Sequence, residues 1–482
     1  MREKKLLSLK RLTRRELPFL TVEDLERGVA WAKRGPQSRK GQLRTEADIE
    51  DFHANLLGQT LLYAKRFSRY YSRTFEGVRA GRYNGRLEPL PTIDKKKVLN
   101  SWFDVVSAEA KPSTVHTTGG TTGSTLEVPT YYEELRARSL FNTISTLLSH
   151  PEKEGWCILF LDDLSHGPGI HPLSDSQAFN IIYEVFQAQE FAGFRNPVLQ
   201  RQVKRIDRIL SGKSRVSRKV GRPRILCAGP KQLKILTNEL ERAKHDPSHY
   251  EIEIICTSGN YLSAQIRHLL RSSWEAKVQD NYGMSEICGG ASQCNKGNYH
   301  FDATAIAELL PIDGSSVPEN SVEGEIVFTG LHPFQQALPL IRYRSSDYAT
   351  FLDRCECGEP GPCMSSYLGR ARDCIVIRHA EPHILSPIPL CNALEKTGVC
   401  STFSGYERVY PRFSWSLREK ARRRVITVVV KCRKLRSRVA RKLMQTTEDT
   451  LRSMIEFHRI DKESLQIEVR ATNRDQFRWI DL

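Results

Sequence analysis

The chain has 482 residues, of which 39% are hydrophobic and 27% are charged, and its formal net charge is +17. No apolar run approaches the roughly 20 residues that a membrane-spanning helix needs, and no secretory signal follows the charged residues 1–5, so we expect a cytoplasmic protein without membrane contact. Twelve cysteines over this length are typical of a compartment that keeps thiols reduced, where some can bind metal. The length allows a large domain and a smaller second one.

The first part of the chain, residues 1–84, is predicted to be a helical N-terminal region. Its clearest helix spans about residues 45–80, because Phe52, Leu56 and Leu61 recur on one face. Leu87-Glu88-Pro89-Leu90-Pro91 ends this region, since two prolines two residues apart cannot continue a helix.

A segment rich in glycine and threonine follows at residues 117–125. It holds three glycines and six hydroxyl side chains, with no charge and no apolar anchor. Such a stretch suits a loop that wraps a phosphate chain, because glycine lets backbone N–H groups approach closely and hydroxyls donate without bulk. The Gly-Lys-Ser/Thr ending of a P-loop is absent. A flexible linker is the alternative interpretation.

Strands and helices alternate through the middle of the chain. Buried strands are predicted at residues 156–161, 224–228 and 252–256, a helix at 231–244, and a later strand at 324–329. This alternation favours an α/β core.

The pattern changes after Gly369. A β-rich run at residues 424–431, a helix at 435–457 and a strand at 465–470 predict a small α+β domain. We therefore divide the chain into a large domain, residues 1–369, and a small C-terminal domain, residues 370–482.

Two basic stretches, residues 201–224 and 418–442, carry the excess positive charge. Basic clusters can bind nucleic acid, but aromatic side chains are scarce in both stretches and no helix-turn-helix or zinc-finger pattern occurs, so nucleic-acid binding is not expected. A solvated basic surface is the simplest interpretation. Docking of an acidic partner or a polyanionic substrate is the alternative.

Three further motifs follow the Gly/Thr loop in order. They are Tyr282-Gly283-Met284-Ser285-Glu286, the run Pro-Leu-Ile-Arg-Tyr-Arg-Ser-Ser-Asp that ends at Asp347, and Gly369-Arg370-Ala371-Arg372-Asp373. In this order and spacing the chain resembles the adenylate-forming superfamily and, within it, the phenylacetate–CoA ligase-like branch. The resemblance covers roughly residues 85–380. It implies a large α/β adenylate-forming domain with mixed sheets and helices, followed by a small C-terminal α+β domain.

The resemblance also implies roles for individual residues in joining a carboxylate to the α-phosphate of ATP. Tyr282 would stack on adenine, Asp347 would accept both ribose hydroxyls, and Arg370 would approach ribose or phosphate. Ser285, where the family usually has Thr, would donate to the α-phosphate, and Glu286 would meet Mg²⁺, a hard cation that prefers carboxylate oxygen. The remaining nucleotide site would comprise Thr118, Gly119, Gly120, Thr121, Thr122, Gly123 and Gly283.

A set of cysteine and histidine residues suits a metal ion. Cys294 and His300 are separated by five residues, and Cys355 and Cys357 follow far along the chain. Three thiolates and one imidazole satisfy a tetrahedral structural zinc, and relatives in the ligase branch carry a similar arrangement. These four residues are the expected ligands, with Cys363 as the substitute if His300 turns toward the substrate. Reduced, unligated cysteines are the alternative.

Departures from the family pattern concern the steps after activation. His379 stands where the family expects a glycine that lets the pantetheine thiol of CoA reach the adenylate, and Arg372 stands at the domain hinge, where the family often has Asp. No lysine occurs after Lys462 to match a C-terminal Gly-Lys that contacts the α-phosphate. Arg474 or Arg478 would substitute, although arginine and lysine are not interchangeable.

The sequence therefore predicts an ATP-dependent ligase that activates an aryl or other small carboxylic acid as its acyl-AMP. Polar residues at 162–171 favour an acid with amino or hydroxyl groups, unless they form a surface loop. The acceptor stays open among a thiol, an amine and a hydroxyl, with CoA or an acidic carrier protein as partner, and a homodimer is left open. The alternatives are a family member that binds nucleotide or ligand without full turnover, and activation of an oxyacid other than a carboxylate.

Overall fold

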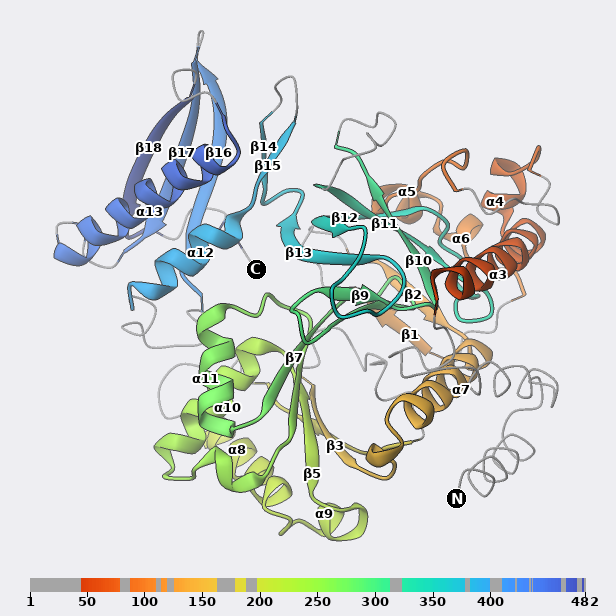
Figure 1. Ribbon diagram of the computed structural model, residues 1–482, viewed down its shortest axis with the longest axis horizontal. Helices are drawn as coiled ribbons and strands as arrows, with labels where there is room; N and C mark the ends of the chain where they lie inside the picture. Colours follow the sequence, from red (N-terminus) through yellow and green to blue (C-terminus); the bar gives the residue numbers. More distant parts are fainter. Residues whose placement is uncertain are drawn as a thin grey trace.

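The structure is a computed structural model (Figure 1). It describes residues 45–78, 87–109, 114–118, 125–162, 178–187, 197–312, 323–377, 382–398, 410–420, 423–432, 435, 437–460, 465–474 and 479–480. Most of the Gly/Thr loop lies outside the described residues, and so do His379 and Arg478.

The N-terminal helical region begins with α3 (Glu46–Phe67), which Thr45 caps by accepting from the backbone N–H of Asp48. The predicted helix over residues 45–80 is interrupted at Ser68, whose side chain caps the next helix, α4 (Arg69–Thr74). Two short helices follow, α5 (Lys95–Asn100) and α6 (Trp102–Val105). A two-stranded sheet, β1 (Thr114–Thr117) and β2 (Glu127–Thr130), flanks the Gly/Thr loop.

A central sheet of 11 described strands has the order β10-β11-β12-β13-β9-β8-β7-β6-β5-β3-β4. Its strands are β3 (Cys157–Asp162), β4 (Asn180–Val185), β5 (Pro223–Ala228), β6 (Ile254–Thr257), β7 (Lys277–Gly283), β8 (Gly290–Gln293), β9 (Tyr299–Phe301), β10 (Ala305–Leu310), β11 (Glu323–Gly330), β12 (Tyr343–Leu352) and β13 (Cys363–Arg370). From β4 to β7 the pairing is parallel, and from β7 to β10 it is antiparallel. β7 is therefore the strand at which the sheet changes type.

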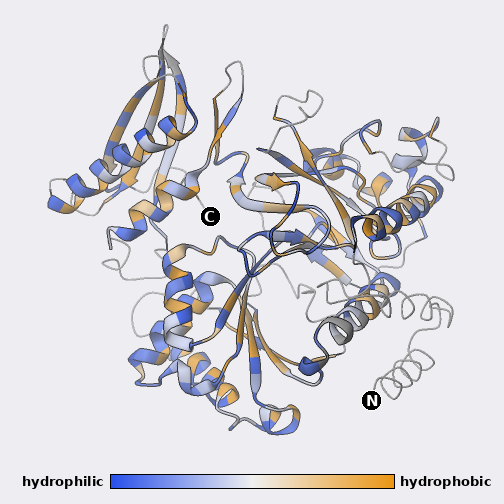
Figure 2. Ribbon diagram, viewed as in Figure 1, coloured by the Kyte–Doolittle hydropathy of each residue, from blue (hydrophilic) through white to orange (hydrophobic). Residues whose placement is uncertain are grey.

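Helices cover the parallel half of the sheet unequally. On one face α8 (Pro197–Leu210), α10 (Pro230–Arg242) and α11 (Ala264–Trp274) pack their apolar sides onto the strands, and Trp274 is fully buried among them. The short α9 (Arg215–Val220) lies beside β4. On the other face stands α7 (Tyr132–Ser149), on the opposite side of β3 and β5 in Figure 1. Figure 2 shows polar and hydrophobic residues alternating along α8, α10 and α11.

The C-terminal part forms a separate core. β14 (Ile375–Ile377) and β15 (His383–Leu385) lead into α12 (Pro387–Lys396), and a three-stranded sheet follows. That sheet contains β16 (Phe413–Lys420), β17 (Arg423–Lys431) and β18 (Leu465–Thr472), with α13 (Arg438–Phe457) packed against it. The predicted α/β class and the small C-terminal α+β part are thus confirmed.

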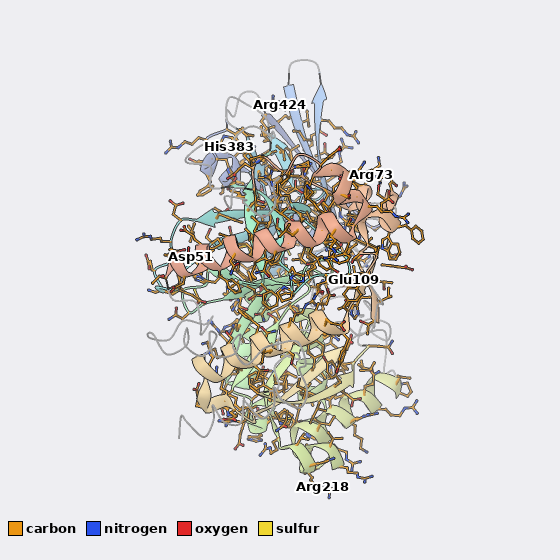
Figure 3. The ribbon with its side chains drawn as sticks, turned by 90° about the vertical axis from the view of Figure 1, so that its right-hand side faces the viewer. Asp51, Arg73, Glu109, Arg218, His383 and Arg424 are labelled. Carbon is orange, nitrogen blue, oxygen red and sulfur yellow. The ribbon has the colours of Figure 1, made fainter. Side chains whose placement is uncertain are left out.

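Two expectations about surfaces also meet the structure. Among the described helices, none is long and apolar enough to cross a membrane. Figure 3 labels Arg218 and Arg424, one from each basic stretch, and they lie toward opposite ends of the molecule.

Candidate functional site

A cavity of about 1220 Å³ opens at the carboxyl end of β7, where the sheet changes from parallel to antiparallel. Open α/β sheets bind ligands at such switch points. The volume exceeds the ~300–1,000 Å³ typical of a single small-molecule site. The cavity brings together these predicted residues: Thr118, Tyr282, Gly283, Ser285, Glu286, Asp347 and Arg370. The other predicted loop residues, Gly119, Gly120, Thr121, Thr122 and Gly123, lie outside the described residues.

Asp347 is a buried carboxylate in the wall of this cavity. Its two carboxylate oxygens accept from the hydroxyls of Tyr282, at 2.9 Å, and Tyr367, at 3.2 Å. Arg370 is its cross-strand partner in the β12–β13 pair. Burial raises the pKa of Asp347 to about 6, although Arg370 and the two tyrosine hydroxyls act in the opposite direction. The side chain is therefore mainly anionic at neutral pH, and a carboxylate has lone pairs left for two further donors.

The backbone of β12 is shaped so that Asp347 faces the cavity. Ser346 adopts a left-handed conformation with φ of 60°, and its N–H donates to the Glu325 carboxylate at 2.9 Å. Ser345 Oγ donates to Ile326 O at 2.6 Å, and the pairing of β11 with β12 shifts register between Glu325 and Val327. Such an irregularity re-aims the following side chain. Ser345 and Ser346 thus set the direction of the Asp347 carboxylate.

Tyr282 reaches Asp347 from the end of β7. Its ring lies beside two other aromatic rings, stacked on Phe328 with centroids 6.3 Å apart and tilted against Tyr367 at 5.8 Å. The ring is half-buried and also lines the cavity. The predicted stacking on adenine stays a prediction.

Lys95 enters the cavity beside Glu286, and the sequence reasoning missed it. Its Nζ donates to Thr118 Oγ1 at 2.7 Å and lies 3.7 Å from Glu286 Oε1. Tyr343 Oη donates to the same carboxylate oxygen at 3.4 Å. Lys95 therefore links Thr118, at the stem of the Gly/Thr loop, to Glu286.

A short backbone bridge delivers Lys95 to this place. The N–H of Ile93 donates to Arg342 O at 3.0 Å, and the N–H of Arg344 donates to Ile93 O at 2.8 Å. These bonds fasten the start of α5 to the start of β12. Arg342 itself is structural, since its guanidinium pairs with Glu308 at 3.2 Å and donates to two backbone carbonyls.

The predicted metal ligands converge as well. One ligand atom each from Cys294, His300, Cys355 and Cys357 lies within 4.8 Å of the others. Cys294 Sγ is 3.7 Å from Cys355 Sγ, and Cys357 Sγ is 3.2 Å from His300 Nε2. The substitute Cys363 is not part of this group, and its thiol donates to Leu352 O at 3.6 Å. The donor set fits tetrahedral zinc.

The metal-ligand group joins two loops that are distant in sequence. Cys294 and His300 belong to the β8–β9 hairpin, whereas Cys355 and Cys357 belong to the β12–β13 connection. Burial raises the pKa of the Cys355 thiol, but hydrogen bonds from Asn298, Cys357 and Cys294 bring the pKa below its ordinary value. A lowered pKa favours the thiolate that a metal requires. His300 also lines the cavity. The group thus lies at the edge of the candidate nucleotide site.

Two arginines at which the chain departs from the family pattern lie in different places relative to the cavity. Arg372 lines the cavity, and its guanidinium is 3.4 Å from the carboxylate of Asp373. Arg474 is exposed beyond β18 and is not among the residues that line the cavity. Its predicted contact with the α-phosphate stays a prediction.

The described chain has the fold of the adenylate-forming ligases. A crystal structure of 2-hydroxyisobutyryl-CoA ligase, in an open conformation with 2-HIB-AMP and CoA, matches 93% of this chain and 95% of that one with a TM-score of 0.65 and 15% identity. The same enzyme in its postadenylation state matches 94% of this chain and 93% of that one with a TM-score of 0.63 and 15% identity. The predicted fold is confirmed by these likenesses.

Sequence matches give the particular relatives. The chain is 27% identical over 162 residues to the phenylacetate-coenzyme A ligase of Pseudomonas putida. This match covers 32% of this chain and 36% of that enzyme. It is 28% identical over 167 residues to the phenylacetate-coenzyme A ligase of Aromatoleum evansii, which spans 33% of this chain and 36% of the relative. The matches thus span about a third of the length of these curated relatives. No family model matches the chain. The predicted resemblance to the phenylacetate–CoA ligase-like branch is confirmed.

Proposed function

We propose that the chain is an ATP-dependent ligase that activates a small carboxylic acid, aryl or other, as its acyl-AMP. One observation carries this proposal: the carboxylate of Asp347 is held by two tyrosine hydroxyls, opposite Arg370, in a cavity that also contains Lys95 and Glu286. A buried anion suits ribose hydroxyls, and a cation beside hydroxyl donors suits phosphate.

In the proposed reaction, the acid's carboxylate attacks the α-phosphorus and pyrophosphate leaves. Asp347 accepts the ribose hydroxyls and fixes the nucleoside. Lys95, Thr118 and Ser285 place positive charge and hydroxyl donors toward the phosphate oxygens. Mg²⁺, held by Glu286, would neutralise charge that develops on those oxygens.

The structural zinc is a second part of the proposal. Three thiols and one imidazole lie within 4.8 Å of one another, and they come from the β8–β9 hairpin and the β12–β13 connection. A zinc ion there would stiffen the edge of the cavity without taking part in the chemistry.

The acceptor of the acyl group is proposed at the level of its chemistry. The named relatives are CoA ligases, so CoA is the first acceptor to test. An amine, a hydroxyl or an acidic carrier protein follows, because His379 replaces the expected glycine. Residues 370–482 are proposed as the small domain that presents the acceptor to residues 1–369.

Acid-dependent exchange of labelled pyrophosphate into ATP tests the proposal. Exchange with at least one acid of a panel of aryl, hydroxylated and short aliphatic acids is expected, and Asp347→Asn should abolish most of it. ATP binding by calorimetry without exchange would favour a nucleotide-binding protein without turnover. AMP release in the absence of any carboxylic acid would favour another oxyacid as substrate.

A further inference from the structure

Gln335 is a buried side chain in the wall of the cavity, where it joins two loops. Its Oε1 accepts from the N–H of Cys288 at 3.0 Å, and its Nε2 donates to Glu286 O at 3.0 Å and to Leu338 O at 2.8 Å. The residue is 4% exposed. One amide thus binds the backbone on both sides of Ile287.

The loop that carries Gln335 is itself clamped from α7. The carboxylate of Glu134 accepts from the N–H groups of Gln336, at 2.5 Å, and Ala337, at 3.1 Å. Arg138 Nε donates to Phe334 O at 2.7 Å. These bonds make the loop a rigid support, because buried backbone groups are satisfied on both of its sides.

A glycine makes room for the amide. A Cβ on Gly330 would lie 2.1 Å from Gln335 Oε1, closer than any contact permits. Gly330 N–H also donates to Leu340 O at 2.9 Å, so the strand end cannot move away easily. Only a residue without a side chain fits beneath Gln335.

The side chain of Glu286 is held less firmly than its backbone. Its carboxylate lies 3.7 Å from Lys95 Nζ and accepts from Tyr343 Oη at 3.4 Å, which are long contacts. The backbone carbonyl of Glu286 and the N–H of Cys288, in contrast, both meet Gln335 at 3.0 Å. Gln335 therefore fixes the stretch of backbone from which the Glu286 carboxylate extends.

We propose that Gln335 is a positioning residue that aims the Glu286 carboxylate at the Mg²⁺–phosphate complex. The inference rests on the proposed function, because the metal-binding role of Glu286 belongs to it. In the proposed role Gln335 acts through the backbone of residues 286–288, to which its amide is bonded on both sides. Its loss weakens metal use in the adenylation step and leaves acid recognition unchanged.

The test uses the full chain and pyrophosphate exchange over a series of Mg²⁺ concentrations. Gln335→Met keeps the length of the side chain and removes all three hydrogen bonds. Gln335→Glu keeps the acceptor for Cys288 N–H and removes both donors. Gln336→Met is the matched control, since that side chain donates only to Pro333 O in the same loop at 2.9 Å.

Both Gln335 variants are expected to need about tenfold more Mg²⁺ for half-maximal exchange, in proportion to the loss of buried hydrogen bonds. The KM for the acid stays within about twofold of the wild-type value, and Gln336→Met matches the wild type in both quantities. A purely structural role would lower the melting temperature and the rate without shifting the Mg²⁺ requirement. That result, in a folded Gln335 variant, would overturn the inference.

If Gln335→Met does not fold, the isosteric Gln335→Glu decides the question by the same two measurements. Absence of exchange in the wild type is a failure of the proposed function. Wild-type exchange together with an unchanged Mg²⁺ requirement in Gln335→Glu is a failure of the positioning role alone.

Discussion

Lys95 Nζ lies 3.7 Å from the Glu286 carboxylate and donates to Thr118 at 2.7 Å. This contact joins the start of a short helix, the stem of the Gly/Thr loop and the end of β7. It places a cation beside the loop that is predicted to bind phosphate, and none of the four motifs that carry the family resemblance contains this lysine.

Replacing Lys95 by alanine should therefore slow adenylation strongly. We expect the rate of pyrophosphate exchange to fall by about 100-fold, the typical effect of losing one preorganised donor to transition-state charge. Lys96→Ala is the control, because that side chain is exposed on the same helix. Equal effects of the two substitutions would mean that the helix, and not the ammonium group, matters.

The ionisation of Asp347 should appear in the pH dependence of ATP use. Its pKa of about 6 means that the carboxylate gains a proton as the pH falls below 6 and then loses an acceptor site for ribose. We expect the KM for ATP to rise up to about tenfold per pH unit below that value. Since ATP also gains a proton in this range, the Asp347→Asn variant supplies the baseline. A pH profile that is the same in both proteins would argue against the role of Asp347.

Asp347→Asn should also change stability, in the direction opposite to activity. The folded pKa is raised above the ordinary value, so the carboxyl contributes stability at low pH that is lost as the pH rises through about 6. Removing the charge is expected to raise the free energy of unfolding at pH 8 by on the order of 1 kcal/mol, and by less at pH 5. Chemical denaturation at the two pH values measures this difference. A destabilised variant at pH 8 would contradict it.

Substitutions of Cys355 and Cys363 should differ in their effect on bound zinc. Cys355→Ser should lower bound zinc well below one ion per chain and lower the melting temperature by several degrees, because a structural zinc ligand contributes to folding. Cys363→Ala removes a fully buried thiol outside the ligand group and should leave the zinc content at one. Mass spectrometry of the metal content, together with thermal unfolding, reads both outcomes. Loss of zinc in Cys363→Ala would show that Cys363 is a zinc ligand in place of His300.

Much of the fold follows from local patterns. The apolar runs at β3 and β5 and the periodicity of α10 predict those elements within a residue or two of their observed bounds. The prediction was less accurate where side chains cap helices. Ser68 interrupts the N-terminal helix, and Ser437 starts α13 after the predicted residue 435, because a serine oxygen competes for the first free N–H groups.

The residues of the candidate site also divide into those that the sequence predicts and those that only the structure identifies. The sequence by itself determined the order of the motifs and picked out the carboxylates Glu286 and Asp347 and four candidate metal ligands, since their chemistry is visible in the residue types. The tertiary structure decided which groups surround them. Tyr367 meets Asp347 because β12 pairs with β13. Cys363 is not part of the metal-ligand group, and its thiol donates to Leu352 O instead.

Lys95 and Gln335 show the physical reason most directly. Three consecutive lysines, residues 95–97, are equivalent in sequence, and only the bridge between Ile93 and β12 determines which of them reaches Glu286. Gln335 is one of two adjacent glutamines, and only the clamp from Glu134 turns it toward the Glu286 backbone. Contacts between segments distant in sequence depend on strand register and burial, which no local pattern contains.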